Sequence, residues 1–287
     1  MATAFQLPNR LETAYRRAIH LVFSKSLPTK LEGMSPSTWV DHLRDLSGRS
    51  SFIEMATTIA KNMIISVNTE NVKSWREASN QSQRSQYLYS LLQKELKGPV
   101  GERFKDLVEH QADLLAGIPR DVAGRLSGEI AAAQQRGERP ETIMSLLHNR
   151  FPALSYGRIK LLARTGVQSS STLLTEARCQ ELDLPWFVWY TSKDQRVRPS
   201  HRNMDGVIVS WSDLPSPEAL IGQKSNLGHY APGNCPNCRC GPLPVLTVED
   251  IYRTGSEQHK VYHDGIIVRM TKAQFTKFSG VELREAA

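Results

Sequence analysis

The sequence predicts an α+β fold, with a mostly helical N-terminal region followed by a small α+β unit that holds a short antiparallel sheet and a cysteine-rich loop. Three observations lead to this prediction. Apolar residues recur at helical spacing over residues 1–150. An aromatic, β-branched segment at 186–191 then has the composition of a strand. Three cysteines follow in a stretch rich in Pro and Gly: Cys235, Cys238 and Cys240.

Length and composition narrow the class of protein. The 287 residues, 40% of them hydrophobic, suffice for two modest domains or one large one. We expect no membrane contact, because no stretch approaches eighteen consecutive apolar residues. The first residues lack the layout of a signal peptide, so we expect the chain to stay in the cytoplasm of the cell that makes it. The net charge of +7 favours contact with polyanions such as DNA, although no run of five like charges marks a nucleic-acid tail.

Helices are predicted in order along the first part of the chain. Ser35-Pro36 is a typical start for a helix that contains Trp39 and Leu43. The segment 64–67 is β-branched enough to suit either a helix or a strand. Phe151-Pro152 predicts a break, with Ser155 capping the helix that follows. The expected helices cover residues 11–23, 36–46, 52–67, 72–96, 104–115, 122–136, 141–148 and 155–177.

Strands are predicted after Pro185. Both faces of 186–191 are apolar, so this strand is expected to be central and covered on each side. A second strand is expected at 206–211, and a hairpin joins 260–262 to 266–270. The chain between Asp213 and Pro244 has the composition of loops. We therefore predict three segments: a helical region at 1–150, an α+β core at 151–250 and a C-terminal hairpin and tail at 251–287.

The cysteine spacing indicates a metal site. Cys235 and Cys238 have the C-x2-C spacing that lets two thiolates reach one tetrahedral ion, and Cys240 adds a third. A closed structural zinc site needs four ligands, so we predict His201 as the fourth, with His229 as its competitor. The alternatives are three free thiols or, less in keeping with a Pro- and Gly-rich loop, a redox pair.

A catalytic interpretation is less favoured. Asp194, His201 and Asp205 are residue types that serve as acids, bases or nucleophile partners. Asp194 equally suits a turn after a strand, and Asp205 before Gly206 suits a turn before one. The sequence has neither a Gly-rich phosphate loop nor the helical motif of zinc proteases. We therefore expect no enzyme activity.

The motifs between Ala163 and Pro242, taken together, resemble those of a known family, the phage Mu F-like head-morphogenesis proteins. The resemblance covers residues 155–245, about a third of the chain. In order, the matching pieces are a helix beginning Ala163-Arg164-Thr165, a strand ending Trp189-Tyr190-Thr191, Asp194-x-Arg196-x-Arg198-x-x-His201, Asp205-Gly206 and Asn237-Cys238-Arg239-Cys240.

The resemblance implies a minor capsid protein of a tailed phage, present in small copy number near the portal inside the procapsid. It implies a part in head assembly, DNA packaging or DNA delivery. The expected partners are the phage portal protein and the major capsid or scaffolding protein, with packaged double-stranded DNA as a non-specific contact. The expected location is the interior of the virion head, after assembly in the host cytoplasm. The alternative is a zinc-stabilised nucleic-acid-binding protein or a toxin-like nucleic-acid-processing enzyme.

The sequence departs from the family pattern at three positions. Many relatives carry cysteines where this chain has Arg198 and His201, and a histidine where it has Cys235. Exchange of Cys for His keeps the capacity to bind a metal, and Arg198 removes one ligand. The resemblance thus leaves His201, Cys235, Cys238 and Cys240 as a Cys3His set for structural Zn²⁺.

Overall fold

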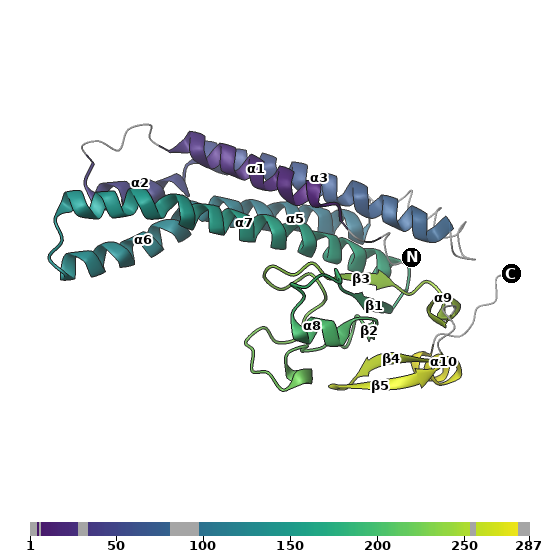
Figure 1. The fold of residues 1–287 in the computed structure, drawn as a ribbon. Coiled ribbons are helices and arrows are strands. Elements are labelled where there is room, and N and C mark those ends of the chain that lie inside the picture. Colours follow the sequence, from purple (N-terminus) through teal and green to yellow (C-terminus); the bar gives the residue numbers. More distant parts are fainter. Residues whose placement is uncertain (1–4, 6, 28–33, 81–97, 253–256, 281–287) are drawn as a thin grey trace. The chain divides into compact units, whose positions relative to one another are not determined.

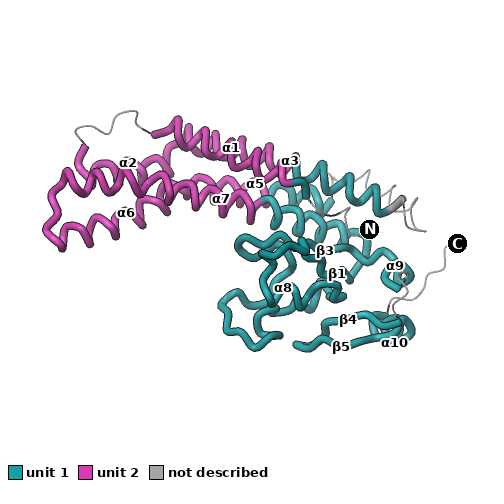
Figure 2. Tube along the Cα trace, viewed as in Figure 1, with its two compact units in different colours: residues 1–8, 66–105, 167–287 teal, residues 9–65, 106–166 magenta. Residues whose placement is uncertain are grey.

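Helices come first along the chain and strands follow, so the predicted α+β class is confirmed (Figure 1). The computed structural model describes residues 5, 7–27, 34–80, 98–252 and 257–280. The chain divides into two compact units (Figure 2). Residues 9–65 and 106–166 form one, here called the helical unit, and residues 1–8, 66–105 and 167–287 form the other, here called the sheet unit.

The predicted segments at 1–150, 151–250 and 251–287 do not coincide with these units. Three long helices contribute residues to both units, so neither unit is continuous in sequence. The segment boundaries remain a prediction about where functional parts begin and end. These long helices are α3 (Ser50–Asn80), α5 (Pro99–Ala116) and α7 (Pro140–Glu181).

Three further helices lie entirely within the helical unit: α1 (Asn9–Ser26), α2 (Pro36–Leu46) and α6 (Ile118–Gln135). Helix α2 begins as predicted, because the Thr38 N–H donates to the Ser35 hydroxyl and Pro36 occupies the first turn. The buried face of α2 packs against α6. Phe151 lies in the same core, with its ring 4.9 Å from that of Trp39 and 5.8 Å from that of Phe23. The packing of apolar side chains thus defines this unit.

Two predicted helix breaks are wrong. No break separates the helices predicted at 52–67 and 72–96, because α3 is continuous from Ser50 to Asn80, and the segment 64–67 is helical. The remainder of the helix predicted at 72–96 lies outside the described residues. Helix α7 is continuous through Pro152, and the Ser155 hydroxyl donates to the Phe151 carbonyl within it. A proline inside a helix costs about 3 kcal/mol. The ring contacts of Phe151 with Phe23 and Trp39, each worth about 0.5 to 1.5 kcal/mol, partly offset that cost.

The sheet unit contains a five-stranded mixed sheet within the described residues, in the order β3-β1-β2-β4-β5. The strands are β1 (Trp186–Tyr190), β2 (Ile208–Ser210), β3 (Gly241–Pro244), β4 (Gln258–His263) and β5 (Ile266–Thr271). Neighbours are antiparallel except β2 and β4, which are parallel, so the sheet is mixed and not purely antiparallel as predicted. As predicted, β1 has a strand on each side, and β4 and β5 form a hairpin. Asp264 and Gly265 both have positive φ, which is typical of the tight turn in such a hairpin.

Strand β3 was not predicted, and its sequence explains why. It reads Gly-Pro-Leu-Pro and pairs with β1 from Gly241 opposite Tyr190 to Pro244 opposite Phe187. Proline cannot donate to a ladder, so it is found on edge strands, and β3 is an edge of this sheet. The strand begins one residue after Cys240, so the pairing of β3 with β1 fixes one end of the cysteine-rich loop.

The two faces of the sheet have different coverings. Phe187 and Trp189 of β1 lie in one core cluster together with the three cysteines of the loop and Met204. The opposite face packs against helices α9 (Val248–Tyr252) and α10 (Lys272–Ser279), through residues such as Ile251 and Phe275. None of the described helices is long and apolar enough to cross a membrane.

Candidate metal centre

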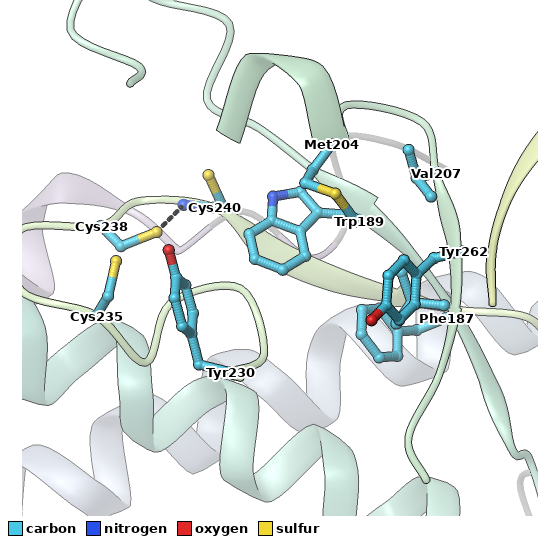
Figure 3. Close-up of a cluster of buried hydrophobic side chains, with 10 residues drawn as sticks. Phe187, Trp189, Met204, Val207, Tyr230, Cys235, Cys238, Cys240 and Tyr262 are labelled. Atoms are coloured by element: carbon cyan, nitrogen blue, oxygen red, sulfur yellow. Dashed lines mark hydrogen bonds between the residues drawn. The ribbon is translucent and has the colours of Figure 1, made fainter. Parts of the chain in front are cut away.

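The candidate metal ligands of the sheet unit lie close together, over the face of the sheet that carries Phe187 and Trp189 of β1. His201 lies on the short helix α8 (Pro199–Met204), whose first turn begins at Pro199. The cysteines lie on a turn in which the Cys238 N–H donates to the Cys235 carbonyl. Asn237 adopts a left-handed conformation, with φ of 59°, which reverses the chain between the two thiols. Figure 3 shows the cysteines beside the Tyr230 hydroxyl, near the buried ring of Trp189.

Three of the four predicted ligands form one cluster. The Nδ1 atom of His201 lies 3.5 Å from the Cys238 sulfur and 3.4 Å from the Cys240 sulfur. The three ligand atoms all lie within 4.8 Å of one another, and all three residues are buried. Ligands about 2.0 to 2.3 Å from a tetrahedral zinc are separated from each other by about 3.3 to 3.8 Å. Both nitrogen–sulfur distances therefore fit those between ligands of one tetrahedral metal ion.

Cys235, the fourth predicted ligand, faces the other nitrogen of the same ring. Its sulfur lies 3.7 Å from His201 Nε2, and Nη1 of Arg198 donates to it at 3.1 Å. Nη2 of Arg198 donates to the Pro236 carbonyl at 2.8 Å. The arginine at a position where many family members carry a cysteine thus contacts this thiol directly. Cys235 is adjacent to the cluster and is not one of its three closest members.

His229, the competing histidine, lies elsewhere. Its side chain is exposed, and its Nδ1 lies 2.6 Å from the Leu214 carbonyl. Between the two histidines considered from the sequence, the structure places His201 among the thiols. His201 is only 2% exposed. Burial lowers the pKa of His201, but hydrogen bonds and charge from Cys235 and Cys238 raise it by more, so the pKa lies at about 9.

Asp194 and Asp205 accept hydrogen bonds from backbone and side-chain groups near the cluster. Asp194 accepts from the Arg196 N–H at 2.9 Å and forms an ion pair with Arg239, which lies between Cys238 and Cys240. Asp205 accepts from the Thr191 N–H at 3.0 Å and from the Thr191 hydroxyl at 2.9 Å. Slight burial raises the pKa of Asp194, but the Arg196 N–H and Arg239 together hold it below its usual value. These contacts are those of turn residues.

Helix α7 anchors the cysteine loop, defined here as residues 232–240. The Thr172 hydroxyl donates to the Pro232 carbonyl at 2.6 Å, and the Gln168 amide donates to the Cys240 carbonyl at 2.9 Å. Gly233 has φ of 94°, and a Cβ there would lie 2.7 Å from the Thr172 hydroxyl oxygen. The close approach of loop and helix therefore requires glycine at this position.

Two further residues at the centre were not predicted. Glu218 and Tyr230 are buried beside His201, and Tyr230 Oη lies 2.9 Å from His201 Nε2. Burial raises the pKa of Tyr230, and Cys235 and Glu218 raise it further. Both residues fall in a part of the chain with loop composition, where no spacing rule connects them to His201. The sequence gives no signal that would have found them.

Comparison with known proteins agrees with the motifs. Residues 125–242 match the family described as Phage Mu protein F like protein. The predicted resemblance to the Mu F-like family is confirmed. The match includes all of α7, His201 and the whole cysteine loop. The candidate metal ligands and the helix that anchors their loop therefore lie within the matched region.

Two curated proteins are similar to the chain over longer segments. Minor head protein GP7 of Bacillus phage SPP1 is 25% identical over 180 residues, which cover 58% of this chain and 58% of that protein. An uncharacterized protein of Haemophilus influenzae is 25% identical over 147 residues, which cover 51% of this chain and 30% of that protein. The chain thus spans 30% and 58% of the lengths of these relatives. No solved structure matches this chain.

Proposed function

We propose that this chain is a minor head protein of a tailed phage that acts beside the portal inside the procapsid, in head assembly, DNA packaging or DNA delivery. The observation that carries the proposal is the Mu F-like match over residues 125–242, a range that contains His201 and the whole cysteine loop. The similarity to a protein named as a minor head protein supports the same role. This role requires scaffolding contacts and no reaction, so we propose that the chain is not an enzyme.

The proposed partners are the portal protein and the major capsid or scaffolding protein. Packaged double-stranded DNA is a further contact, through the excess of positive charge, and such a contact weakens as salt is added. The proposed location is the interior of the virion head near the portal. We propose that the N-terminal helices make the portal contact.

We further propose that the centre binds structural Zn²⁺ through His201, Cys238 and Cys240, with Cys235 as the fourth ligand. Buried thiolates and an imidazole at tetrahedral separations are the donors that zinc prefers. The Cys235 thiol is already in hydrogen-bonding contact with that of Cys238, which supports Cys235 as the fourth ligand. The ion would close the cysteine loop and would supply no reactive chemistry.

The experiment that tests the head-protein role is co-expression with the portal protein of the same phage, followed by affinity capture and sizing. We expect the full chain to copurify with portal assemblies, and Cys238→Ser to copurify as well, because the helices are the proposed contact. Mass spectrometry of purified virions should detect the chain in small copy number. A folded chain that elutes apart from the portal and is absent from virions would contradict the proposal.

A further inference from the structure

His201, Tyr230 and Glu218 form a chain of buried hydrogen bonds, here called the relay. It begins at Nε2 of His201, whereas Nδ1 faces Cys238 and Cys240. His201 Nε2 is 2.9 Å from the Tyr230 hydroxyl oxygen, and that hydroxyl donates to both carboxylate oxygens of Glu218 at 2.9 Å. The Ser200 hydroxyl donates to the same carboxylate at 3.0 Å. Glu218 is 7% exposed, so its charge is held by these partners and only slightly by water.

The number of hydrogens available in the relay determines which atom donates and which accepts in each hydrogen bond. A phenol has one hydrogen, and Tyr230 gives that hydrogen to Glu218. The Tyr230 oxygen can therefore only accept from His201, which requires the hydrogen of a neutral ring to be on Nε2. The other candidate acceptor on this side, the Cys235 sulfur, is 3.7 Å from Nε2 and is the weaker one. Nδ1 is then left with a free lone pair, and it faces the two sulfurs of the cluster.

We propose that Glu218 and Tyr230 are positioning residues for the metal centre, which fix the ring of His201 so that it binds the metal through Nδ1. The inference rests on the zinc site proposed above and adds the nitrogen that binds and the residues that select it. Histidine ligands commonly donate their second N–H to a carboxylate, a carbonyl or a water, and this orients the ring and strengthens the ligand. Here a tyrosine stands between the imidazole and the carboxylate.

The relay also accounts for how the buried Glu218 carboxylate is held, because no arginine or lysine within the described part of the chain forms an ion pair with it. The imidazole of His201 lies beside it, with Nε2 3.9 Å from a Glu218 oxygen. When a divalent ion occupies the Nδ1 side, the ring becomes polarised and its Nε2–H becomes a stronger donor. Tyr230 passes this effect to Glu218 through its 2.9 Å hydrogen bond. Metal binding and the buried carboxylate therefore stabilise each other.

The test measures zinc affinity by competition with a chromophoric chelator, on the full chain. Tyr230→Phe removes only the hydroxyl, and we expect about 10- to 100-fold weaker zinc binding with the fold retained. Glu218→Gln keeps an acceptor for Tyr230 and should lie closer to wild type than Tyr230→Phe does. Tyr252→Phe is the matched control, because its hydroxyl donates to the Met270 carbonyl away from the centre. The control should bind zinc as wild type does.

NMR of the zinc-loaded wild-type protein gives a second readout that needs no variant. The ring carbon shifts of His201 should show coordination through Nδ1 and a hydrogen on Nε2. Coordination through Nε2, or unchanged affinity in Tyr230→Phe beside a zinc-binding wild type, would overturn the relay and leave the zinc site standing. A wild-type protein that binds no zinc would overturn the zinc site, and the inference with it.

Discussion

The helical unit and the cysteine loop are ordered by different kinds of contact. In the helical unit, α2 and α6 pack through apolar side chains, and Leu43 is 0% exposed within that contact. In the cysteine loop, three backbone carbonyls are held by side chains from outside: Pro232 by Thr172, Cys240 by Gln168 and Pro236 by Arg198. The helical unit is stabilised by how well its apolar side chains fill the core. The cysteine loop is stabilised by hydrogen bonds between individual polar atoms.

This difference determines what each region can tolerate. An apolar core accepts a substitution of similar volume, whereas a loop held by directed bonds is loosened when one donor or ligand is lost. The loop has no helix or strand of its own between Pro232 and Cys240. It therefore benefits most from a bound ion, since the ion ties several thiols at once. The predictions below separate the two regions, beginning with the largest expected effect.

Cys238→Ser should abolish zinc binding and loosen the sheet unit. Zinc contributes on the order of 10 kcal/mol in small zinc domains, and a serine hydroxyl is a poor replacement for a thiolate. Elemental mass spectrometry should find about one zinc per chain in the wild type and none in the variant. Cys179→Ser is the control, because Cys179 is buried in a different cluster. Retention of zinc by Cys238→Ser would contradict the assigned ligand set.

Leu43→Ala should destabilise the helical unit and leave zinc binding unchanged. A buried Leu→Ala change costs about 2 to 5 kcal/mol, from lost transfer energy and the cavity that remains. Hydrogen exchange should speed up in α2 and α6, and the zinc content should equal that of the wild type. Loss of zinc in this variant would show that the two regions are not separable.

Thr172→Val should loosen the cysteine loop by a smaller amount. The variant keeps the shape of the side chain and removes the donor to the Pro232 carbonyl, which costs about 1 to 3 kcal/mol when the acceptor stays buried. Zinc affinity should fall while ligand number stays the same. Thr57→Val, at a threonine that bonds only within α3 at the surface, is the comparison variant and should leave the affinity unchanged.

Asp194→Asn should have the smallest effect, about 1 kcal/mol or less, because the ion pair with Arg239 is partly exposed. The pKa of Asp194 is depressed below its usual 3.8, so its charge adds stability above that pH. That stability is lost as the pH falls through the lower, folded-state pKa. The thermal midpoints of the wild type and Asp194→Asn should therefore converge on acidification. A gap that widens at low pH would contradict the ion pair.

The parts of the fold set by local chemistry were predictable. Ser35 and Pro36 start α2, and Asp264-Gly265 forms the hairpin turn, because caps and tight turns depend on a few adjacent residues. The continuity of α7 through Pro152 was not predictable, because the aromatic partners that hold Phe151 in the helix lie far away in sequence. Strand β3 was missed because its two prolines suit only an edge, and sequence alone does not reveal which strand is the edge.

The candidate site likewise has residues that the sequence could identify and residues that only the structure reveals. Residue type and spacing pointed to His201, Cys235, Cys238 and Cys240, because a C-x2-C pair, a third thiol and an imidazole are ordinary zinc donors. The structure brings His201, Cys238 and Cys240 into one cluster. The contact between Arg198 and Cys235 depends on a rotamer and has no sequence signature. Glu218 and Tyr230 reach His201 only after the chain has folded back over β1, so their roles require the structure.

The most direct test of the contrast between the two regions is hydrogen exchange, followed by mass spectrometry, on the zinc-loaded full chain and on the same protein after chelation. We predict that chelation speeds exchange in the cysteine loop and in α8, while α1, α2 and α6 stay protected. Unchanged exchange in the cysteine loop after verified zinc removal would contradict the account. Equal loss of protection in the helical unit would contradict it as well.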